Sequence, residues 1–541
     1  MIITNTSPGN FLTDGPYVDL VAPPPPIPTG PATGLIAIIG AANYGPVNTP
    51  TYFNDPSSLF NAFGNGTTLG YSLVDEALQA MPECQLFVGV RVTDGTDTSA
   101  VINITDGSAG NVIVLTAKYT GTYQNAATAL VSLVSGTSSV KPVYNITISS
   151  PGVSAEVFTN IIGYSSSAYS AATFQANALA AINGTLANQP GSLRWTATAG
   201  ASTIAPTTGT SFTASGGTNG TTSLTATTCI GTDGITGRTG LYTLRGIVQG
   251  AQVFIAQNTT ATTGATLVSF ASSENCSALI AFPSLTATNT EISTRATNNL
   301  IAPNLFLASD WTWAYDQVSQ TTFLHSPIGP TAAIIAAQPP WMYPGGKPAG
   351  AQGKLGIIST DRNGNPNTNP PSGSSPISVA EAGQRQQAGI LYLTNNPNLY
   401  FQNAGYGLPH GMASDGKTLI SDTRMTQSIA VGIQSVLGNY VGSMIAIVNG
   451  KLIIVGPNGG PANPQGAINA YLSSMTSGRT PQIAAFSNTL SAQNNSVVSV
   501  QQGFLIANIF VQTLSAAKFI LAFTQVGNTV NIPAVQISQA S

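Results

Sequence analysis

The first hundred residues alternate between continuous apolar runs and stretches of helical periodicity. The run 35–39 is apolar throughout, and 85–92 is apolar apart from Gln85 and Arg91, which predicts two buried strands. Between them, 56–63 and 72–80 carry apolar residues at helical spacing. An Asp-Pro pair before the first of these, and a glycine after it, suit the N-cap, the first turn and the stop of a helix. This order of strand, two helices and strand indicates an α/β sheet.

The texture changes in the middle of the chain. Residues 101–225 are rich in Thr, Ser and Gly with short β-branched runs, which predicts an inserted, mostly β domain. An Ala-rich stretch, about 168–182, is expected to be its one helix. Helical and strand patterns return in 226–400, beginning with a helix near 238–248, and a loop rich in Pro, Gly and Asn spans 339–376. We therefore expect the α/β domain, begun in 34–100, to be completed after the insertion.

The C-terminal part reads as a further α/β domain, 401–527, with strand-like arms at both ends of the chain. Residues 1–33 form an extended arm that contains the proline run PPPPIP at 23–28. Residues 528–541 alternate apolar and polar positions, as an edge strand does. The elements expected in the C-terminal domain are a helix at 425–441, a helix at 464–475, a strand at 501–512 and a helix at 514–527.

Composition excludes several partners. Charged residues make up 6% of the 541 residues, and the net charge is −3, so nothing favours nucleic acid or an anionic membrane as a partner. A surface with so little charge resists self-association poorly, which suits a protein that meets copies of itself. Residues 1–20 lack the basic and apolar regions of a signal peptide, so we expect synthesis in the cytoplasm.

The three cysteines have no spacing typical of a metal site. We expect buried free thiols, and the alternative is a disulfide between subunits once an assembly leaves the reducing cell. The residues concerned are Cys84, Cys229 and Cys276.

Three stretches resemble chemical motifs without the context that such motifs require. The turn in 34–50 lacks the middle glycine of a dinucleotide fingerprint. GMASDGKT, 411–418, matches the P-loop pattern, but no apolar strand leads into it and the following helix is expected only near Thr423. Ser309, Asp310 and His325 form an imaginable triad without a nucleophile elbow. We expect structural roles for all three, and no cofactor, metal or catalytic residue.

The charge of the last part of the chain is one-sided, because no Asp or Glu follows Asp422. Its basic residues are candidates for contact with an acidic partner: Arg424, Lys451, Arg479 and Lys518. Apolar residues of the two arms are candidates for donation to a neighbour's sheet by β-augmentation, with a strand on the edge of the same domain as the alternative. These residues are Val18, Leu20, Val21, Val530, Ile532, Val535 and Ile537.

Taken in order, several motifs resemble the contractile bacteriophage tail sheath family. The first part, GLIAIIGAANYGPVNTPTYFNDPSSLFNAFG followed by LVDEALQAMPECQLFVGVRV, is similar to the N-terminal core of those proteins, including a near-terminal arginine at Arg91. The other matching stretches are KYTGTYQN (118–125), AEVFTNI (155–161), GGTNG (216–220), GKTLISDTRM (416–425) and GFLIANIFVQTLSAAKFILAF (503–523). The resemblance runs from about residue 34 to 527, with different spacer lengths.

The resemblance implies a structural protein rather than an enzyme. Sheath subunits polymerise as stacked rings around an inner tail tube, joined by their arms, and contract to drive the tube through the host envelope. The implied partners are the chain itself, the tube protein, and baseplate and terminator proteins, in a virion tail assembled in the host cytoplasm. The C-terminal domain would face the tube and the β-rich insertion would face outward.

Two other classes of protein remain as alternatives. A P-loop enzyme would use 411–418 to bind ATP, and Lys417→Ala would abolish the binding. A surface-layer protein or adhesin shares the charge-poor texture but needs an export signal.

Overall fold

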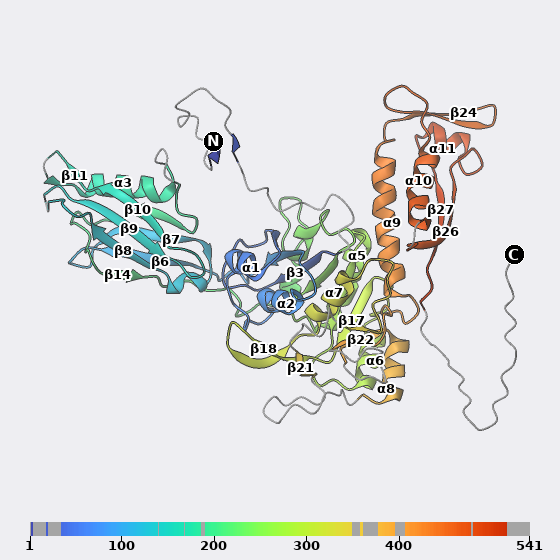
Figure 1. Ribbon diagram of the computed structural model, residues 1–541, viewed down its shortest axis with the longest axis horizontal. Coiled ribbons are helices and arrows are strands. Elements are labelled where there is room, and N and C mark those ends of the chain that lie inside the picture. Colours follow the sequence, from blue (N-terminus) through green and yellow to red (C-terminus); the bar gives the residue numbers. More distant parts are fainter. Residues whose placement is uncertain are drawn as a thin grey trace.

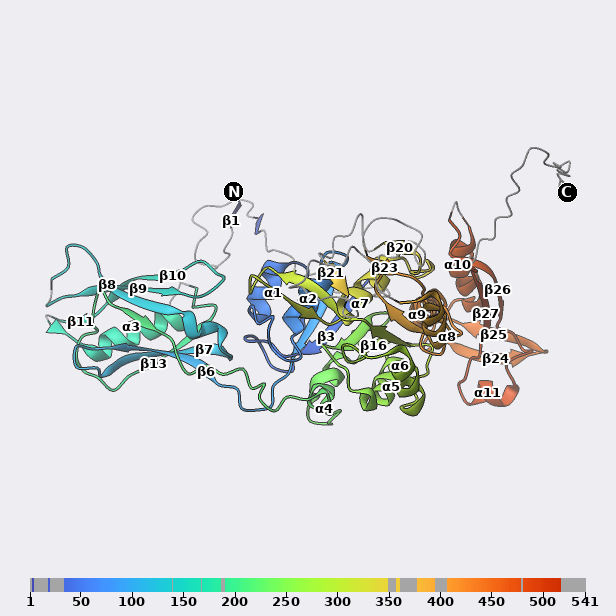
Figure 2. The same cartoon turned by 90° about the horizontal axis from the view of Figure 1, so that it is seen from below.

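The computed structural model describes residues 2–3, 18–19, 34–138, 140–166, 168–185, 190–348, 357–360, 377–394, 406–477 and 480–516. The long axis runs from a β-rich unit, through an α/β core, to a C-terminal region (Figures 1 and 2). The expected mixture of α/β and α+β parts is therefore observed. In the described part of the chain, no helix has the length and apolar character needed to cross a membrane.

A seven-stranded sheet forms the centre of the core. Its order is β22-β17-β16-β15-β3-β5-β4, with β4 antiparallel at one edge and the other strands parallel. The strands are β3 (Ile36–Gly40), β4 (Thr51–Phe53), β5 (Phe87–Arg91), β15 (Gln252–Ile255), β16 (Ser277–Ala281), β17 (Leu305–Ser309) and β22 (Ile390–Tyr392). Both faces are covered, which explains why these strands are continuous apolar runs rather than alternating ones.

Helices cover the two faces of this sheet. Ile36 and Ile38 point to the face packed by α1 (Pro56–Phe63), α2 (Leu73–Ala80) and α7 (Ile328–Ala337). Leu35, Ala37 and Ile39 point to the other face. The elements that cover this second face are α4 (Ala226–Ile230), the 3-10 turn η2 (Gly240–Leu244) and α5 (Gly264–Ser273). Two further helices, α6 (Thr288–Thr297) and α8 (Val379–Ala388), pack against each other.

The sequence predicted the first helix, α1, correctly, but the helix predicted near 238–248 does not form. Asp55 caps α1 through a capping box, with Pro56 in the first turn and Gly64 after the last. The α-helix predicted near 238–248 is wrong, because only the 3-10 turn η2 forms there. Gly240 and Gly246 have φ values of +55° and +79°, which a right-handed helix does not contain.

The β-rich unit has a core of its own. Two sheets, β13-β7-β6 and β10-β9-β8-β14, enclose a cluster that includes Trp195 of β13 and Phe174 of α3 (Ala171–Asn183). The strands are β6 (Ser99–Thr105), β7 (Asn111–Thr120), β8 (Thr128–Leu133), β9 (Val143–Ser149), β10 (Glu156–Ile162), β13 (Trp195–Ala199) and β14 (Ser211–Thr213). A small pair, β11 (Tyr164–Ser165) and β12 (Ala168–Tyr169), precedes α3. The helix expected at about 168–182 is confirmed.

Part of the predicted loop 339–376 belongs to small sheets. β18 (Thr312–Asp316) pairs with β19 (Thr321–His325) and with β21 (Ile357–Thr360). β20 (Lys347–Pro348) pairs with β23 (Gly407–Leu408). Near the N-terminus, β1 (Ile2–Ile3) pairs in parallel with β2 (Val18–Asp19).

The C-terminal region is built on α9 (Ile420–Gly438), which begins five residues before the predicted start at 425, and α10 (Pro464–Thr476). Two hairpin-like pairs complete it: β24 (Met444–Val448) with β25 (Lys451–Val455), and β26 (Ile483–Thr489) with β27 (Asn508–Thr513). The strand predicted at 501–512 begins only at Asn508, after the short helix α11 (Val497–Gln501). Most of the predicted helix 514–527, and the predicted strand 528–541, lie outside the described residues.

Candidate functional site

The glycine turn after β3 is filled by protein atoms. Gly45 has a φ of +101°, and a Cβ atom at this position would lie 2.1 Å from the carbonyl oxygen of Ala62. Arg91 Nη1 donates to the carbonyl oxygens of Gly45 (2.7 Å) and Thr120 (2.8 Å), and burial lowers the pKa of Arg91 to about 10. This arginine ties the turn to the β-rich unit. The geometry supports a structural turn rather than a phosphate cradle.

The P-loop-like octet 411–418 is closed by its own aspartate. Asp415 Oδ1 accepts from the backbone N–H groups of Lys417 and Thr418, both at 2.9 Å, and Oδ2 accepts from Thr418 Oγ1 at 2.5 Å. Burial of Asp415 is outweighed by these hydrogen bonds, which lower its pKa. Although α9 begins at Ile420, nearer to the octet than expected, the amides that would bind a phosphate are occupied by a carboxylate. This arrangement supports a structural turn.

The structure separates the three residues of the imagined triad. His325 contacts Asp75, whereas Ser309 donates to Glu291 and Asp310 binds Arg385. The two groups are distinct buried clusters. Neither was predicted from the sequence.

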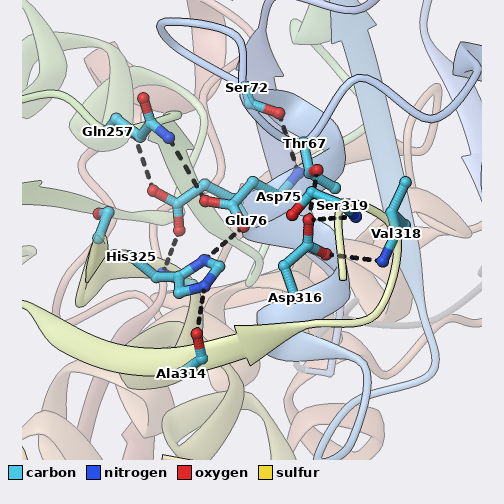
Figure 3. Close-up of polar contacts among 12 residues, drawn as sticks. Thr67, Ser72, Asp75, Glu76, Gln257, Ala314, Asp316, Val318, Ser319 and His325 are labelled. Carbon is cyan, nitrogen blue, oxygen red and sulfur yellow. Dashed lines mark hydrogen bonds and ion pairs between the residues drawn. The ribbon is translucent and has the colours of Figure 1, made fainter. Parts of the chain in front are cut away.

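The first cluster, which we call the His325 cluster, comprises Asp75, Glu76, Gln257, Asp316 and His325 (Figure 3). His325 Nδ1 lies 2.6 Å from Asp75 Oδ1, and Nε2 lies 3.2 Å from the carbonyl oxygen of Ala314. A carbonyl oxygen only accepts, so Nε2 carries a proton, and a second proton lies between Nδ1 and Asp75. Burial disfavours the imidazolium, but the hydrogen bond and charge of Asp75 outweigh it and raise the pKa of His325.

Two acids of the cluster, Asp75 and Glu76, are also protonated more readily than usual. Burial raises the pKa of Asp75 against the opposing effect of His325. Burial, and then the charge of Asp75, raise the pKa of Glu76 to about 8. Glu76 accepts from the backbone N–H groups of Gln257 (2.8 Å) and Gly329 (2.7 Å), so it joins the start of α7 to the end of β15. The cluster therefore fastens α2, α7 and the β18–β19 hairpin to one another.

The second cluster, which we call the Arg385 cluster, contains Arg385, Glu291 and Asp310. Arg385 lies 2.7 Å from Asp310 Oδ2 and 2.9 Å from Glu291 Oε2, and its guanidinium packs on the ring of Tyr392 at 5.1 Å. Burial opposes the charge of Arg385, but the two carboxylates outweigh it and raise its pKa. The cluster joins α8, α6 and the end of β17.

Neither cluster has the properties of a catalytic centre. The side chains of His325 and Arg385 have no exposed surface, so a substrate would not reach them. The pocket beside the His325 cluster is lined by Asp316 alone among its members, and that carboxylate accepts from Thr67, Val318 and Ser319. No group of three or more His, Cys, Asp or Glu side chains that could hold a metal ion occurs within the described residues. The geometry indicates positioning rather than chemistry.

One of the basic residues proposed for a tube contact must be withdrawn. Arg424 is 1% exposed and donates from α9 to the carbonyl oxygen of Pro339 at 3.4 Å, and burial lowers its pKa to about 10. A side chain inside its own subunit does not reach a partner, so the prediction is wrong for Arg424. Lys451 is exposed at the start of β25, and Arg479 and Lys518 lie outside the described residues.

The alternative, a disulfide between subunits, stays a prediction that the burial of the three thiols does not favour. Cys84, Cys229 and Cys276 are free, and none is more than 6% exposed. Burial raises the pKa of all three thiols, to about 12 for Cys229. They are buried thiols, as the first interpretation expected.

The structure reveals an apolar surface that the sequence analysis missed. Side chains of the two C-terminal strand pairs and their connections are largely exposed, and the described strands form only two-stranded sheets with open edges. The most exposed of these residues are Val441 (78%), Met444 (74%), Phe510 (70%), Val498 (62%) and Phe504 (60%). We call this the C-terminal apolar surface. Its signal in the sequence was the pair of short apolar runs at 441–448 and 504–511.

Of the arm residues proposed for subunit contacts, only Val18 lies in a described strand, β2. The others, Leu20, Val21, Val530, Ile532, Val535 and Ile537, lie outside the described residues. Donation of either arm to a neighbour stays a prediction.

Comparison with known proteins places the fold. No family model matches the sequence, and no functionally characterised protein matches it. A sheath tail protein of Listeria innocua superposes with a TM-score of 0.53 at 13% identity, over 89% of this chain and 95% of that one. The sheath tail protein of Desulfitobacterium hafniense gives a TM-score of 0.48 at 11% identity, over 79% and 83% of the two chains. A chain of the anti-feeding prophage baseplate gives 0.46 at 10% identity, over 95% and 99%.

At these identities the likeness concerns the fold. It extends over most of both chains in the Listeria innocua comparison, so it includes more than the central α/β sheet. The superposition with the Listeria innocua protein therefore shows that the chain has the fold of a sheath tail protein.

Proposed function

We propose that this chain is a structural subunit of a contractile tail sheath, which polymerises as stacked rings around an inner tube. On triggering, the rings contract and drive the tube through the host cell envelope. The observation that carries the proposal is the fold likeness to a sheath tail protein over 89% of this chain and 95% of that protein. The order of the sheath-like motifs along the sequence supports it independently.

The surface of the chain supports a role in assembly. The C-terminal apolar surface exposes large side chains beside open strand edges, which is typical of a face that another chain covers. Several charged side chains of the described core lie in buried clusters that hold elements together. The proposed partners are further copies of this chain, the tube protein, and the baseplate and terminator proteins.

Within the sheath, we place the C-terminal region toward the tube and the β-rich unit toward the outside. The arms would complete sheets of neighbouring subunits, and Lys451, Arg479 and Lys518 would face acidic groups on the tube. The energy of contraction would be stored in subunit packing, so the role needs neither a nucleotide nor a metal. The location that follows is a virion tail assembled in the host cytoplasm, without insertion of the chain into a membrane.

Electron microscopy of the purified full-length chain in negative stain tests this function. We expect hollow tubes of stacked rings, and we expect them to be lost or shortened in a variant that lacks residues 528–541. Val441→Ser on the C-terminal apolar surface should also impair tube formation. Val379→Ser on α8 is the matched control, since the two valines are 78% and 72% exposed. Monodisperse monomers in every sample would contradict the proposal.

A further inference from the structure

A cleft of about 810 Å³ lies where the core meets the β-rich unit. Its walls come from the start of α1, the end of α2 and the β18–β19 hairpin on the core side. Tyr123, Pro151 and Gly152 contribute the wall on the side of the β-rich unit. α1 and β18 lie at the end of the core nearer to the β-rich unit (Figures 1 and 2). Of the two buried clusters described above, only the His325 cluster contributes to the cleft, through Asp316.

The cleft is lined by aromatic, proline and amide side chains and by a single charged residue. Phe60, Tyr123 and Tyr315 offer ring surfaces, and Tyr315 is 52% exposed. The side-chain amides of Asn65, Gln79 and Gln317 supply N–H donors around the rim. Asp316 is its one charged lining residue, and its carboxylate accepts from Thr67 and from the backbone N–H groups of Val318 and Ser319.

Aromatic surfaces with nearby donors suit a polyproline segment. Proline rings pack on aromatic side chains, and the carbonyl oxygens of the segment accept hydrogen bonds because proline has no N–H to offer. A preformed polyproline helix also loses little conformational entropy on binding. Because the one carboxylate of the cleft, Asp316, is already bonded within the chain, a cleft of this composition favours an uncharged, proline-rich occupant.

We propose that this cleft binds the oligoproline segment 23–28 of the same chain. The segment, PPPPIP, has no charged neighbour between residues 22 and 33. The position of Gly34, where the continuous described chain starts, favours this occupant. The carbonyl oxygen of Gly34 lies 3.0 Å from Cys84 Sγ. Cys84 follows two residues after Pro82, which lines the cleft. Five residues lie between Pro28 and Gly34, and the six Cα–Cα steps from one to the other reach up to about 20 Å, so the segment is tethered within range.

Docking there would fix the course of the N-terminal arm where it leaves the core. It would also bridge the core and the β-rich unit, since Tyr123 and Pro151 belong to one side and Phe60 and Met81 to the other. The cleft would bind the segment whether or not the chain assembles into a sheath, so the two proposals fail separately.

Photo-cross-linking in the full-length chain tests the docking. Tyr315 is replaced by p-benzoylphenylalanine, the dilute protein is irradiated, and cross-linked peptides are identified by mass spectrometry. We expect a cross-link from position 315 to residues 23–28 at the mass of a single chain. The same photoreactive residue at Val379, 72% exposed on α8, should not give it.

Two further outcomes decide the assignment. The combined change Pro24→Ser and Pro25→Ser leaves the cleft intact and should reduce the yield of the cross-link about tenfold. Cross-links from position 315 that never reach 23–28, or that survive the serine changes undiminished, would overturn the proposal. A cross-link to 23–28 found only at twice the chain mass would also overturn it, because the segment would then come from a second copy.

Discussion

Removal of Arg385 should destabilise the α/β core far more than removal of an exposed arginine. Arg385 has no exposed side-chain surface and lies 2.7 Å from Asp310 and 2.9 Å from Glu291. Arg385→Met keeps most of the apolar stem but leaves two carboxylates buried without their cation. Breaking a buried ion pair in this way costs about 3–5 kcal/mol. The effect should concentrate where α6, α8 and β17 meet.

Hydrogen–deuterium exchange reports this loss locally, which matters in a chain with several cooperative units. A loss of about 3–5 kcal/mol corresponds to exchange of the β17 amides faster by a factor of roughly 10² to 4 × 10³, if they exchange through opening of the core. The β9 amides, in the separate core of the β-rich unit, serve as an internal reference. Arg245→Met is the matched control, because Arg245 bonds Asp233 and Glu274 at the surface. Equal effects of the two substitutions on β17 would refute the reasoning.

The other predictions concern pH, backbone conformation, nucleotide and salt. Because the pKa of Glu76 is raised from 4.5 to about 8, the folded chain holds this proton more tightly than the unfolded chain. The free energy of unfolding of the core should therefore fall as pH rises from 4.5 to about 8, by at most about 1.4 kcal/mol per pH unit. In Glu76→Gln, the denaturation midpoint should change less with pH than in the unchanged chain. A rise over this window would contradict it. Gly45→Ala should lower the free energy of unfolding, measured by urea denaturation, by about 1–3 kcal/mol. Gly70→Ala, which has open space around the added Cβ, should have little effect, and equal effects of the two substitutions would count against strain at the turn. Calorimetric titration with Mg-ATP should show no binding, and binding abolished by Lys417→Ala would reopen the P-loop interpretation. Assembled tubes should withstand high ionic strength and low pH in electron micrographs, and their dissociation by moderate salt alone would count against contacts made mainly by apolar surface.

Much of the core could be predicted because its signals are local. The continuous apolar run of β3 has to be buried on both faces, and Asp55, Pro56 and Gly64 mark both ends of α1 within ten residues. The helix predicted near 238–248 failed for a reason that is also local but was not visible from periodicity. Glycine permits positive φ without requiring it, and only the packed structure shows that Gly240 and Gly246 adopt it.

The candidate sites could not be predicted, because their partners are far apart in the sequence. Asp75 and His325 are separated by 250 residues, and Arg385 and Asp310 by 75. Polar residues near one another along the chain suggested a triad of Ser309, Asp310 and His325. In the structure, Ser309 and Asp310 contact members of the Arg385 cluster, whereas His325 contacts Asp75. The sequence likewise gave no sign that Arg424 faces inward, since α9 carries polar residues on several sides.

The few charged side chains of this chain help to define its fold, because many of them are buried and join separate elements. Ten charged side chains are buried within the described residues, although only 6% of the whole sequence is charged. Several of them join elements that packing alone would leave less defined: Arg91 links the core to the β-rich unit, and Arg385 links two helices to a strand end. A buried charge needs its partner in one geometry, so such pairs favour one arrangement of rigid parts. The exterior then consists mainly of hydroxyl, amide and apolar groups. In the proposed sheath, contacts between copies would depend on apolar burial and backbone hydrogen bonds, which ions screen little. The buried charges would then keep the shape of each subunit constant during the proposed change in packing between subunits.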